Sequence, residues 1–237
     1  MSENKIERFL YLFKELEKEV IALSDIKSDD YVPFSRALNK IYYDKSNPLL
    51  SDYDNYSYLR SASDLRNLLS HENDTCIPTD EFIQKGERLL SRLKHPVTVY
   101  DISTKEIEYC TMNEKVFSIM KKMNLLGLSH FPILNQEKKV IGVFSRSSIF
   151  DGILQEIRFD SSSLVSDFEK VTGLSSHLNE SFLFVSKTTT AEKVFTFLEN
   201  RSAHKKNIAC LFVTQNGSKD EKLIGICTLA DLAKAKQ

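Results

Sequence analysis

Three residues near the C-terminus have the types and the spacing of a phosphate and ribose site. Gly225, Thr228 and Asp231 follow one another at intervals of three, where an apolar run gives way to a helical pattern. A Thr at a helix N-terminus can cap the helix or hydrogen-bond a phosphate oxygen. An Asp one turn later can accept hydrogen bonds from a ribose diol. The alternative is a plain helix start, with Thr228 as the cap and Asp231 complementing the helix dipole.

A second constellation, R-N-x-x-x-H, consists of Arg66, Asn67 and His71. A His with a pKa near neutrality can act as a general acid or base, and an Arg can hold a phosphate and stabilise its developing charge. Arg66 and His71 lie about 140° apart on an ideal helix, so they converge only if the helix ends near Ser70 or a partner subunit supplies one of them. In the alternative, Arg66 pairs with a nearby acidic residue and His71 complements the helix dipole.

Composition excludes several classes of protein. The 237 residues are 41% hydrophobic and 27% charged with a net charge of −1, so no global field favours nucleic acid. The N-terminus lacks the apolar core of a signal peptide, and no apolar run reaches the ~18 residues of a membrane span. We therefore expect a cytoplasmic protein without membrane contact. Four scattered Cys and five His without ligand spacing predict reduced thiols and no metal site.

Up to about residue 95 the chain has a helical pattern. Apolar residues recur at intervals of three and four from Ile6 to Val20, and Pro33 opens a second helix. A third helix is expected from Asp52 to Ser70, and Thr79 caps a fourth. Short connections between these helices predict a four-helix bundle over residues 1–95. The apolar positions of the third helix are Tyr56, Leu59, Ala62, Leu65, Leu68 and Leu69.

Beyond His95-Pro96, strands and helices alternate twice in the same order. The first series predicts a strand at 97–100, a helix at 112–126, strands at 131–134 and 140–144, and a helix from Ser147. The second series predicts the same order at 182–185, 191–199, 208–213, 222–227 and 229–236. The run EKVF occurs at 114–117 and at 192–195. Such a repeat indicates a duplicated module. The predicted fold class is α+β, with β-α-β-β-α repeats at 96–152 and 182–237 joined by a Ser-rich linker or short helical excursion at 153–181.

This repeat resembles the CBS domain pair, or Bateman module. The resemblance is carried by the EKVF run, the SHFPIL stretch and the closing signature G-h-x-[ST]-x-x-[DN], where h is apolar. The second copy fits the signature from Gly225 to Asp231, whereas the first has Gly142, Ser145 and then Ser148 in place of the carboxylate.

The resemblance implies a regulatory ligand and not a required cofactor. The ligand would be an adenine nucleotide (AMP, ADP or ATP), with its phosphate and ribose held by Thr228 and Asp231. The purine would lie beside the strands of the second copy that carry Phe184, Val185, Ser186 and Phe212. The corresponding residues of the first copy are Thr98, Tyr100, Phe131, Pro132 and Ser145. The resemblance also implies a homodimer.

The helical region and its R-N-x-x-x-H motif are similar to HEPN domains, helical bundles found in many prokaryotic RNA-cleaving toxins and defence proteins. That similarity implies metal-independent RNA cleavage by Arg66, Asn67 and His71 across a dimer cleft. Two functions therefore stay open. The first is a ligand-sensing regulatory protein whose bundle dimerises or contacts a partner. The second is an RNA-cleaving HEPN enzyme controlled by the CBS pair.

Overall fold

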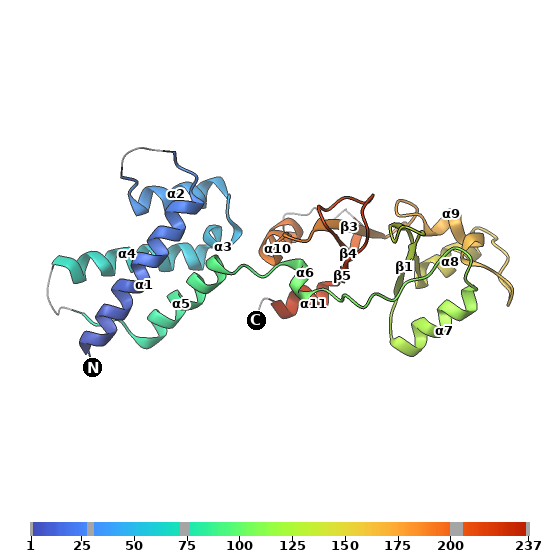
Figure 1. Cartoon of the computed structure of the whole chain (residues 1–237), viewed down its shortest axis with the longest axis horizontal. Helices are drawn as coiled ribbons and strands as arrows, with labels where there is room; N and C mark the ends of the chain where they lie inside the picture. Colours follow the sequence, from blue (N-terminus) through green and yellow to red (C-terminus); the bar gives the residue numbers. More distant parts are fainter. Residues whose placement is uncertain (1, 28–30, 72–75, 200–205, 236–237) are drawn as a thin grey trace. The chain divides into compact units, whose positions relative to one another are not determined.

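The computed structural model describes residues 2–27, 31–71, 76–199 and 206–235, and the fold is α+β. Its contacts divide the chain into two compact units. The first unit is the part up to Val97 together with Glu192–Glu199. The second unit is Thr98–Ala191 together with the chain beyond Glu199. Figure 1 shows the helical region at the N-terminal end and the mixed region that carries every described strand.

The first unit is built around one apolar core. Phe9, Phe13 and Leu16 of one helix pack with Leu38, Leu59 and other buried residues of its neighbours. Among the helices of this unit, the first and the fifth make the most extensive contact with each other. The helices up to Val97 are α1 (Ser2–Leu23), α2 (Phe34–Asp44), α3 (Pro48–Ser51), α4 (Tyr53–His71) and α5 (Asp80–Lys94).

Local signals account for the starts of these helices. The Thr79 hydroxyl accepts a hydrogen bond from the Phe82 amide at 3.2 Å and caps α5, as expected. Asn47 caps α3 in the same way, a short helix that the periodicity does not predict. The expectation that Leu68 faces the core is wrong, because its side chain is 50% exposed. It lies nine residues after the buried Leu59, which is about 180° around the helix.

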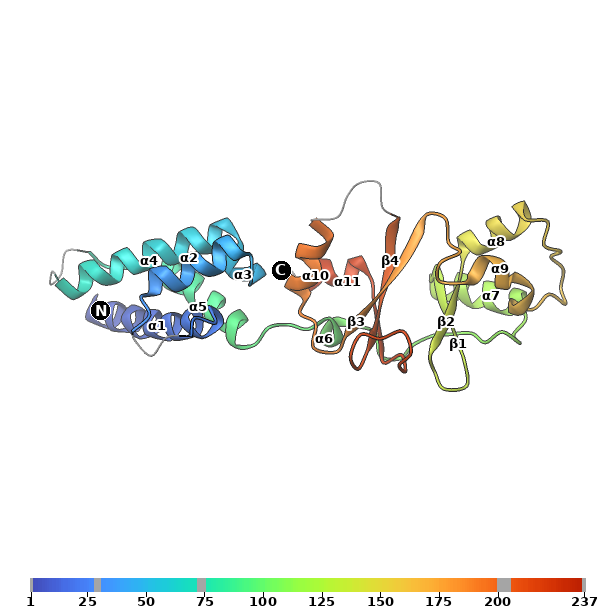
Figure 2. The ribbon, with the colours of Figure 1, turned by 90° about the horizontal axis from the view of Figure 1, so that it is seen from above.

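The second unit contains two small sheets. Strand β1 pairs with β2 antiparallel, while β4 pairs with β3 in parallel and with β5 antiparallel. Figure 2 shows the β1–β2 hairpin with α7, α8 and α9 around it. The elements of the first repeat are α6 (Val99–Ile102), α7 (Val116–Leu126), β1 (His130–Leu134), β2 (Val140–Ser145), α8 (Arg146–Leu154), the 3-10 helix η1 (Val165–Phe168) and α9 (Glu169–Thr172). Those of the second are β3 (Glu180–Ser186), α10 (Ala191–Glu199), β4 (Asn207–Thr214), β5 (Gly225–Cys227) and α11 (Leu229–Ala235).

Strand register relates the two repeats residue by residue. Ile133 pairs with Gly142 in the first hairpin, and Val213 pairs with Gly225 in the second. Ser145 therefore corresponds to Thr228, and Ser148 corresponds to Asp231. The buried residues of β1–β2 and β4 share one core cluster, so the repeats pack against each other through their sheets.

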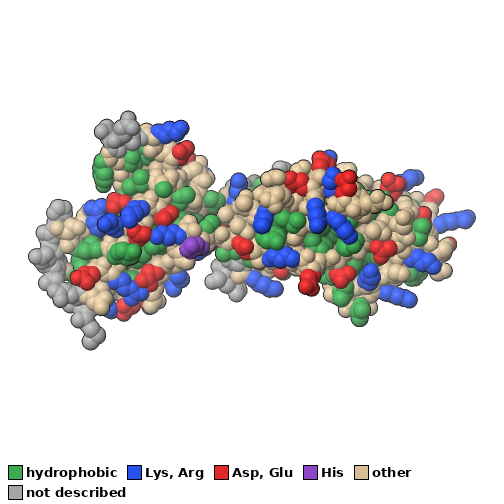
Figure 3. Space-filling view, in the orientation of Figure 1, with side chains coloured by type: hydrophobic (Ala, Val, Ile, Leu, Met, Phe, Trp, Pro, Cys, Tyr) green, Lys and Arg blue, Asp and Glu red, His purple; other side chains and the backbone are tan. Residues whose placement is uncertain are grey.

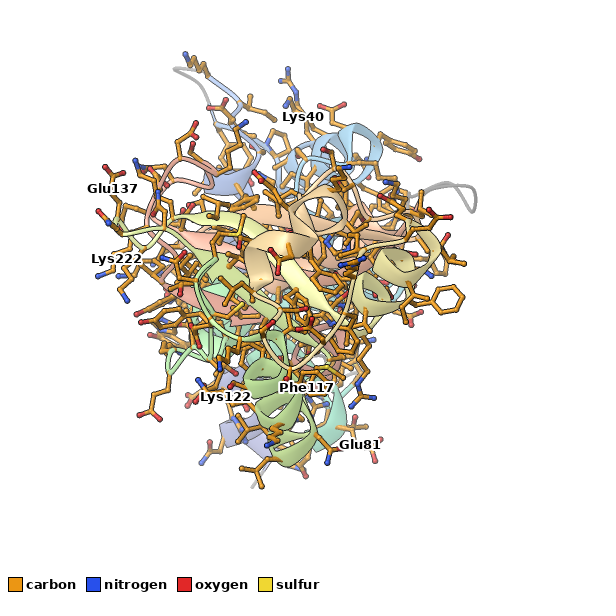
Figure 4. The ribbon with its side chains drawn as sticks, turned by 90° about the vertical axis from the view of Figure 1, so that its right-hand side faces the viewer. Lys40, Glu81, Phe117, Lys122, Glu137 and Lys222 are labelled. Atoms are coloured by element: carbon orange, nitrogen blue, oxygen red, sulfur yellow. The ribbon has the colours of Figure 1, made fainter. Side chains whose placement is uncertain are left out.

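The turn of the first hairpin also contacts the second repeat. Lys139 forms a β-bridge with Lys222, and the Leu223 amide donates to the Lys138 carbonyl at 3.0 Å. Figure 4 shows Glu137, from this turn, and Lys222 on the same side of the molecule. This contact helps to fix the two sheets relative to each other.

The strand predicted at residues 97–100 is wrong. Thr98 caps α6, because its hydroxyl accepts from the Asp101 amide at 3.2 Å and the Asp101 carboxylate accepts from the Thr98 amide at 2.9 Å. This capping box satisfies backbone donors that a strand would have to pair with a neighbour. In the first repeat, the extended segment that corresponds to β3 comes later in the chain, at Cys110. Cys110 bridges Ile133 in parallel, just as Val185 of β3 pairs in parallel with Val213.

Other boundaries also shift. The helix expected from Met112 begins at Val116, and the strand expected from Lys222 begins at Gly225. The helix expected at 229–236 is described only as far as Ala235.

The segment 153–181 contributes to the core of the first repeat. Val165, Phe168 and Val171 are buried with Phe131 and Phe144. Backbone hydrogen bonds of 2.9 Å join the segment to the start of α7, from the Val116 amide to Ser163 and from the Val165 amide to Glu114. We propose that the first repeat extends through Thr172.

Candidate ligand-binding site

A cavity of about 390 Å³ opens within the second unit, between the two repeats. Three segments form most of its wall: the extended stretch after α6, the start of β1, and β4 with the β5–α11 junction. Its lining residues are Thr104, Glu106, Ile107, Glu108, Leu128, Ser129, His130, Pro132, Ala209, Cys210, Phe212, Ile226, Thr228, Leu229 and Ala230.

Backbone pairing places the stretch after α6 against the second repeat. The Thr104 amide donates to the Ile226 carbonyl at 2.8 Å, and the Ile226 amide donates back to Thr104 at 3.0 Å. This two-bond bridge brings Glu106 and Glu108 to the same cavity as Thr228. The cavity therefore combines an apolar wall, two carboxylates and a hydroxyl.

Three of the predicted ligand residues line the cavity. Thr228 and Phe212 come from the second repeat, and Pro132 comes from the first. Register makes Pro132 the counterpart of Phe212, since they pair with Val143 and Ile226 respectively. The residues that sequence reasoning assigned to two separate sites thus meet at one.

Asp231 lies directly behind Thr228 and forms a capping box with it. Oδ2 of Asp231 accepts from the Thr228 amide at 2.9 Å and from its hydroxyl at 2.8 Å, and the Asp231 amide donates to Thr228 Oγ1 at 3.3 Å. These bonds are those of the plain helix start. They also fix the Thr228 hydroxyl at the rim of the cavity.

The remaining predicted residues lie outside the cavity lining. Phe184 packs on Phe212 with ring centroids 5.3 Å apart, so it supports the wall from behind. The Ser186 hydroxyl bonds to that of Thr188 at 2.9 Å, and Val185 pairs with Val213 in the sheet. Thr98 caps α6, and the Tyr100 ring lies beneath the ammonium groups of Lys105 and Lys187.

The first-repeat counterpart of this site holds a buried polar cluster. Ser145 and Ser148 are fully buried and form their own capping box. The Glu180 carboxylate accepts hydrogen bonds from Ser145 Oγ at 3.3 Å and Ser147 Oγ at 3.2 Å. Its oxygens also lie 3.1 Å from His130 Nε2 and 3.4 Å from His177 Nδ1. We refer to Ser145, Ser147, His130, His177 and Glu180 as the Glu180 cluster.

Burial and hydrogen bonding compete in setting the pKa values of this cluster. Desolvation raises the pKa of Glu180, but the hydrogen bond and charge of His130, the Ser147 hydroxyl and the charge of His177 outweigh it, so the net pKa is lowered. Desolvation lowers the pKa of His177, and the nearby Glu180 carboxylate only partly offsets this effect. Among the described residues, no neighbour forms a well-directed hydrogen bond with either ring nitrogen of His177.

In the helical unit, Arg66 has a packing role. Its guanidinium lies 3.4 Å from the Glu17 carboxylate and 5.2 Å from the centre of the Phe13 ring. Asn67 is exposed, and the His71 side chain lies outside the described side chains. The acidic partner of Arg66 is thus Glu17 on α1 and not the nearby Asp64, while Glu72, the other acidic residue near Arg66 in the sequence, lies outside the described residues.

Thiols and metals give no further site in the described chain. Burial raises the pKa of Cys110, Cys210 and Cys227 to about 12, so these thiols are poor nucleophiles. The described residues contain no group of three or more His, Cys, Asp or Glu side chains suited to a metal ion. Within the same residues, no helix is long and apolar enough to cross a membrane. Figure 3 shows acidic and basic side chains interspersed over the visible face.

Comparison with known proteins identifies the repeats. The family model described as CBS domain matches residues 99–155 and 174–237, just over half of the chain. A search of curated proteins finds no match.

Several solved structures are similar to this chain. The CBS domain pair of MJ0100, in complex with 5-methylthioadenosine and S-adenosyl-L-methionine, is 16% identical, with a TM-score of 0.44 over 60% of this chain and 96% of that one. CBSX2 in complex with AMP is 22% identical, with a TM-score of 0.42 over 59% and 96%. An acetoin utilization protein (AcuB) from Vibrio cholerae is 23% identical, with a TM-score of 0.40 over 60% and 90%.

Proposed function

This chain belongs to the CBS domain family, and we propose that its repeat pair senses an adenine nucleotide or a related adenosine derivative bound beside Thr228. The observation that carries the proposal is the cavity of about 390 Å³, which both repeats line and which the Thr228 hydroxyl borders. Its size lies within the usual range for small-molecule sites, roughly 300–1,000 Å³. A ligand there would contact both repeats at once, so its binding would favour one arrangement of the pair.

The lining divides into parts that match those of a nucleoside. Pro132, Phe212 and Ile226 offer an apolar surface for a purine ring. The Thr228 hydroxyl donates its one proton to the Asp231 carboxylate, so in this arrangement it can accept a hydrogen bond from a ribose hydroxyl, and it can donate to a phosphate oxygen only after turning away from Asp231. We propose that Asp231 also accepts from the ribose diol, which would give one carboxylate both a structural and a binding role.

Calorimetric titration with AMP, ADP, ATP, 5-methylthioadenosine and S-adenosylmethionine tests the proposal. The informative variant is Ala230→Trp, which fills the cavity without removing a polar group. Ala233→Trp is the matched control, because Ala233 is also exposed on α11 but does not line the cavity. We expect one of the five compounds to bind the parent and the control alike, and Ala230→Trp to weaken binding at least tenfold. No heat for any compound, or equal affinities in the two variants, refutes the proposal.

For the helical unit we propose dimerisation or contact with a partner protein. No observation on the described residues favours RNA cleavage, because Arg66 is held by Glu17 and Phe13. If the protein nevertheless cleaves tRNA or mRNA, and His71→Ala abolishes the cleavage, the regulatory proposal for this unit is wrong.

A further inference from the structure

The Glu180 cluster occupies the place in the first repeat that corresponds to the cavity beside Thr228. Strand register makes Ser145 the counterpart of Thr228 and His130 the counterpart of the cavity-lining Cys210. The start of β3 corresponds to the stretch Thr104–Glu108, because Val185 pairs with Val213 as Cys110 bridges Ile133. Glu180 is the first residue of β3.

The Glu180 carboxylate makes contacts there of the kind that a ligand's anionic group would make. It accepts hydrogen bonds from Ser145 and Ser147, which cap and begin the nine-residue helix α8. Hydroxyls and amides at such a helix start are common partners of phosphate and carboxylate groups. His130 completes the set, with Nε2 3.1 Å from the carboxylate.

A second observation points to the same site. His177 is only 1% exposed, and its Nδ1 lies 3.4 Å from a carboxylate oxygen of Glu180. The backbones of Thr172 and Val143 are its other polar neighbours, although neither forms a well-directed hydrogen bond with the ring. His177 therefore adds a buried polar side chain to the groups that face the Glu180 carboxylate.

Ser148 fits this arrangement. Its counterpart in the second repeat is Asp231, and the family signature has a carboxylate at that position. A carboxylate at 148 would lie beside Ser145, which already bonds to Glu180, so two negative charges would lie close together at a largely buried position. The neutral Ser148 and the charged Glu180 therefore compensate for each other.

We propose that Glu180 occupies the ligand site of the first repeat, so that the pair binds one ligand and not two. This inference rests on the proposed function for the ligand that binds beside Thr228. Its structural half does not depend on any ligand. This half states that the carboxylate of Glu180 takes the place of the carboxylate that the family signature has at position 148.

The ligand-independent test is a double-mutant cycle read by chemical unfolding. Ser148→Asp is expected to destabilise the parent strongly, through repulsion from Glu180, and to be much less destabilising in a Glu180→Ala background. Glu137→Ala is the control background. It also removes a carboxylate, but an exposed one that pairs with Lys139 in the same repeat as Ser148. If Ser148→Asp is equally costly in all three backgrounds, Glu180 does not hold the site.

The ligand test records the amide spectra of the full chain with AMP, or with the compound that calorimetry shows to bind the parent if that compound is not AMP. In the parent we expect one bound molecule, with shifts at Thr228–Asp231 and none at Ser145–Ser148. In the double variant Glu180→Ala/Ser148→Asp we expect two bound molecules and shifts at both places. Two bound molecules in the parent, or one in the folded double variant, overturns the inference but leaves the proposed function intact. No binding by either protein counts against the ligand half of the inference, and the unfolding cycle then decides its structural half.

Discussion

Thr228 and Asp231 show how one pair of side chains can satisfy two descriptions. Their mutual hydrogen bonds are those of a capping box, and the same bonds fix the position of the Thr228 hydroxyl, on a residue that lines the cavity. Thr98 and Asp101 form an equivalent box on α6, away from the cavity lining. The type and spacing of the residues are therefore insufficient to separate helix capping from ligand binding, and only the surroundings of each box do so.

This comparison supplies a prediction for the carboxylates. Asp231→Ala and Asp101→Ala each remove the acidic half of a capping box, and each should lower the free energy of unfolding by about 1 kcal/mol or less. Only Asp231→Ala should also weaken ligand binding, by tenfold or more. Urea unfolding and calorimetry on both variants check the two effects. Equal ligand affinity in the two variants would show that Asp231 serves only as a cap.

His177 predicts how stability depends on pH. Burial lowers its folded-state pKa below the value of about 6.5 of an unfolded His. Above pH 6.5 both states are neutral at this group, whereas at lower pH the unfolded chain takes up a proton that the folded protein does not. The contribution of His177 therefore falls as the pH drops from about 6.5. The pKa of Glu180 is also lowered, so its contribution is present above about pH 4.5 and is lost only in stronger acid.

The measurement is urea unfolding at pH 7.5, 6.5 and 5.5. The parent should lose stability across this range, and His177→Asn should lose less, because Asn does not titrate. His95→Asn is the control, since it makes the same replacement at an exposed His. Parallel pH profiles for the parent and His177→Asn would contradict the prediction.

At the scale of elements, the periodicity of apolar residues predicts the amphipathic helices and strands. It does not predict elements that depend on local capping interactions. The β1–β2 hairpin, α10 and β4 appear within two residues of the predicted ranges, because each has a strong apolar pattern. Val-Thr-Val-Tyr at 97–100 has a high β-propensity and so predicts a strand, whereas the structure has the capping box of α6 there. Tyr100 is sixteen residues before Val116, whereas Val185 is only nine before Val194, and this mismatch of spacing was a usable signal.

A small part of the candidate site could be predicted, and the rest depends on tertiary contact. Thr228, Phe212 and Pro132 belong to elements that the repeat makes visible. Glu106 and Glu108 reach the cavity only because Thr104 bridges Ile226, a pairing between residues far apart in sequence. No local pattern encodes that bridge. Glu180 was missed for the same reason, since its partners come from β1, α8 and a loop.

The segment 153–181 contributes more to the core than its composition indicates, and this leads to a prediction about stability. Its Ser-rich start suggests a linker, yet Phe168 is fully buried and packs edge-on against Phe144 and Phe159. Phe168→Ala should lower the free energy of unfolding by about 3–5 kcal/mol, since it leaves a cavity in the core. Tyr53→Ala, at an exposed position of α4, should change it by about 0.5 kcal/mol or less. Comparable effects of the two changes in urea unfolding would mean that the segment is only a linker.

At the scale of the whole molecule, the exposed face of α8 bears on assembly. Phe150, Ile153 and Leu154 are 64%, 58% and 65% exposed and are spaced so that they share one side of the helix. A contiguous apolar patch of this kind usually marks a contact surface, whereas single exposed apolar residues need no explanation. The dimer that the sequence led us to expect therefore has a specific candidate surface on the first repeat.

We predict that the protein forms a homodimer through this face of α8, and that Phe150→Asp weakens the dimer at least tenfold by placing a charge in an apolar contact. Tyr43→Asp is the control, because it puts the same charge in place of another exposed aromatic residue on a helix, in the first unit. Light scattering after size exclusion, over a range of concentrations, measures both. A monomeric parent, or a Phe150→Asp protein as dimeric as the parent, rules out this face. If Tyr43→Asp alone gives a monomer, the helical unit forms the dimer and the α8 patch serves another partner.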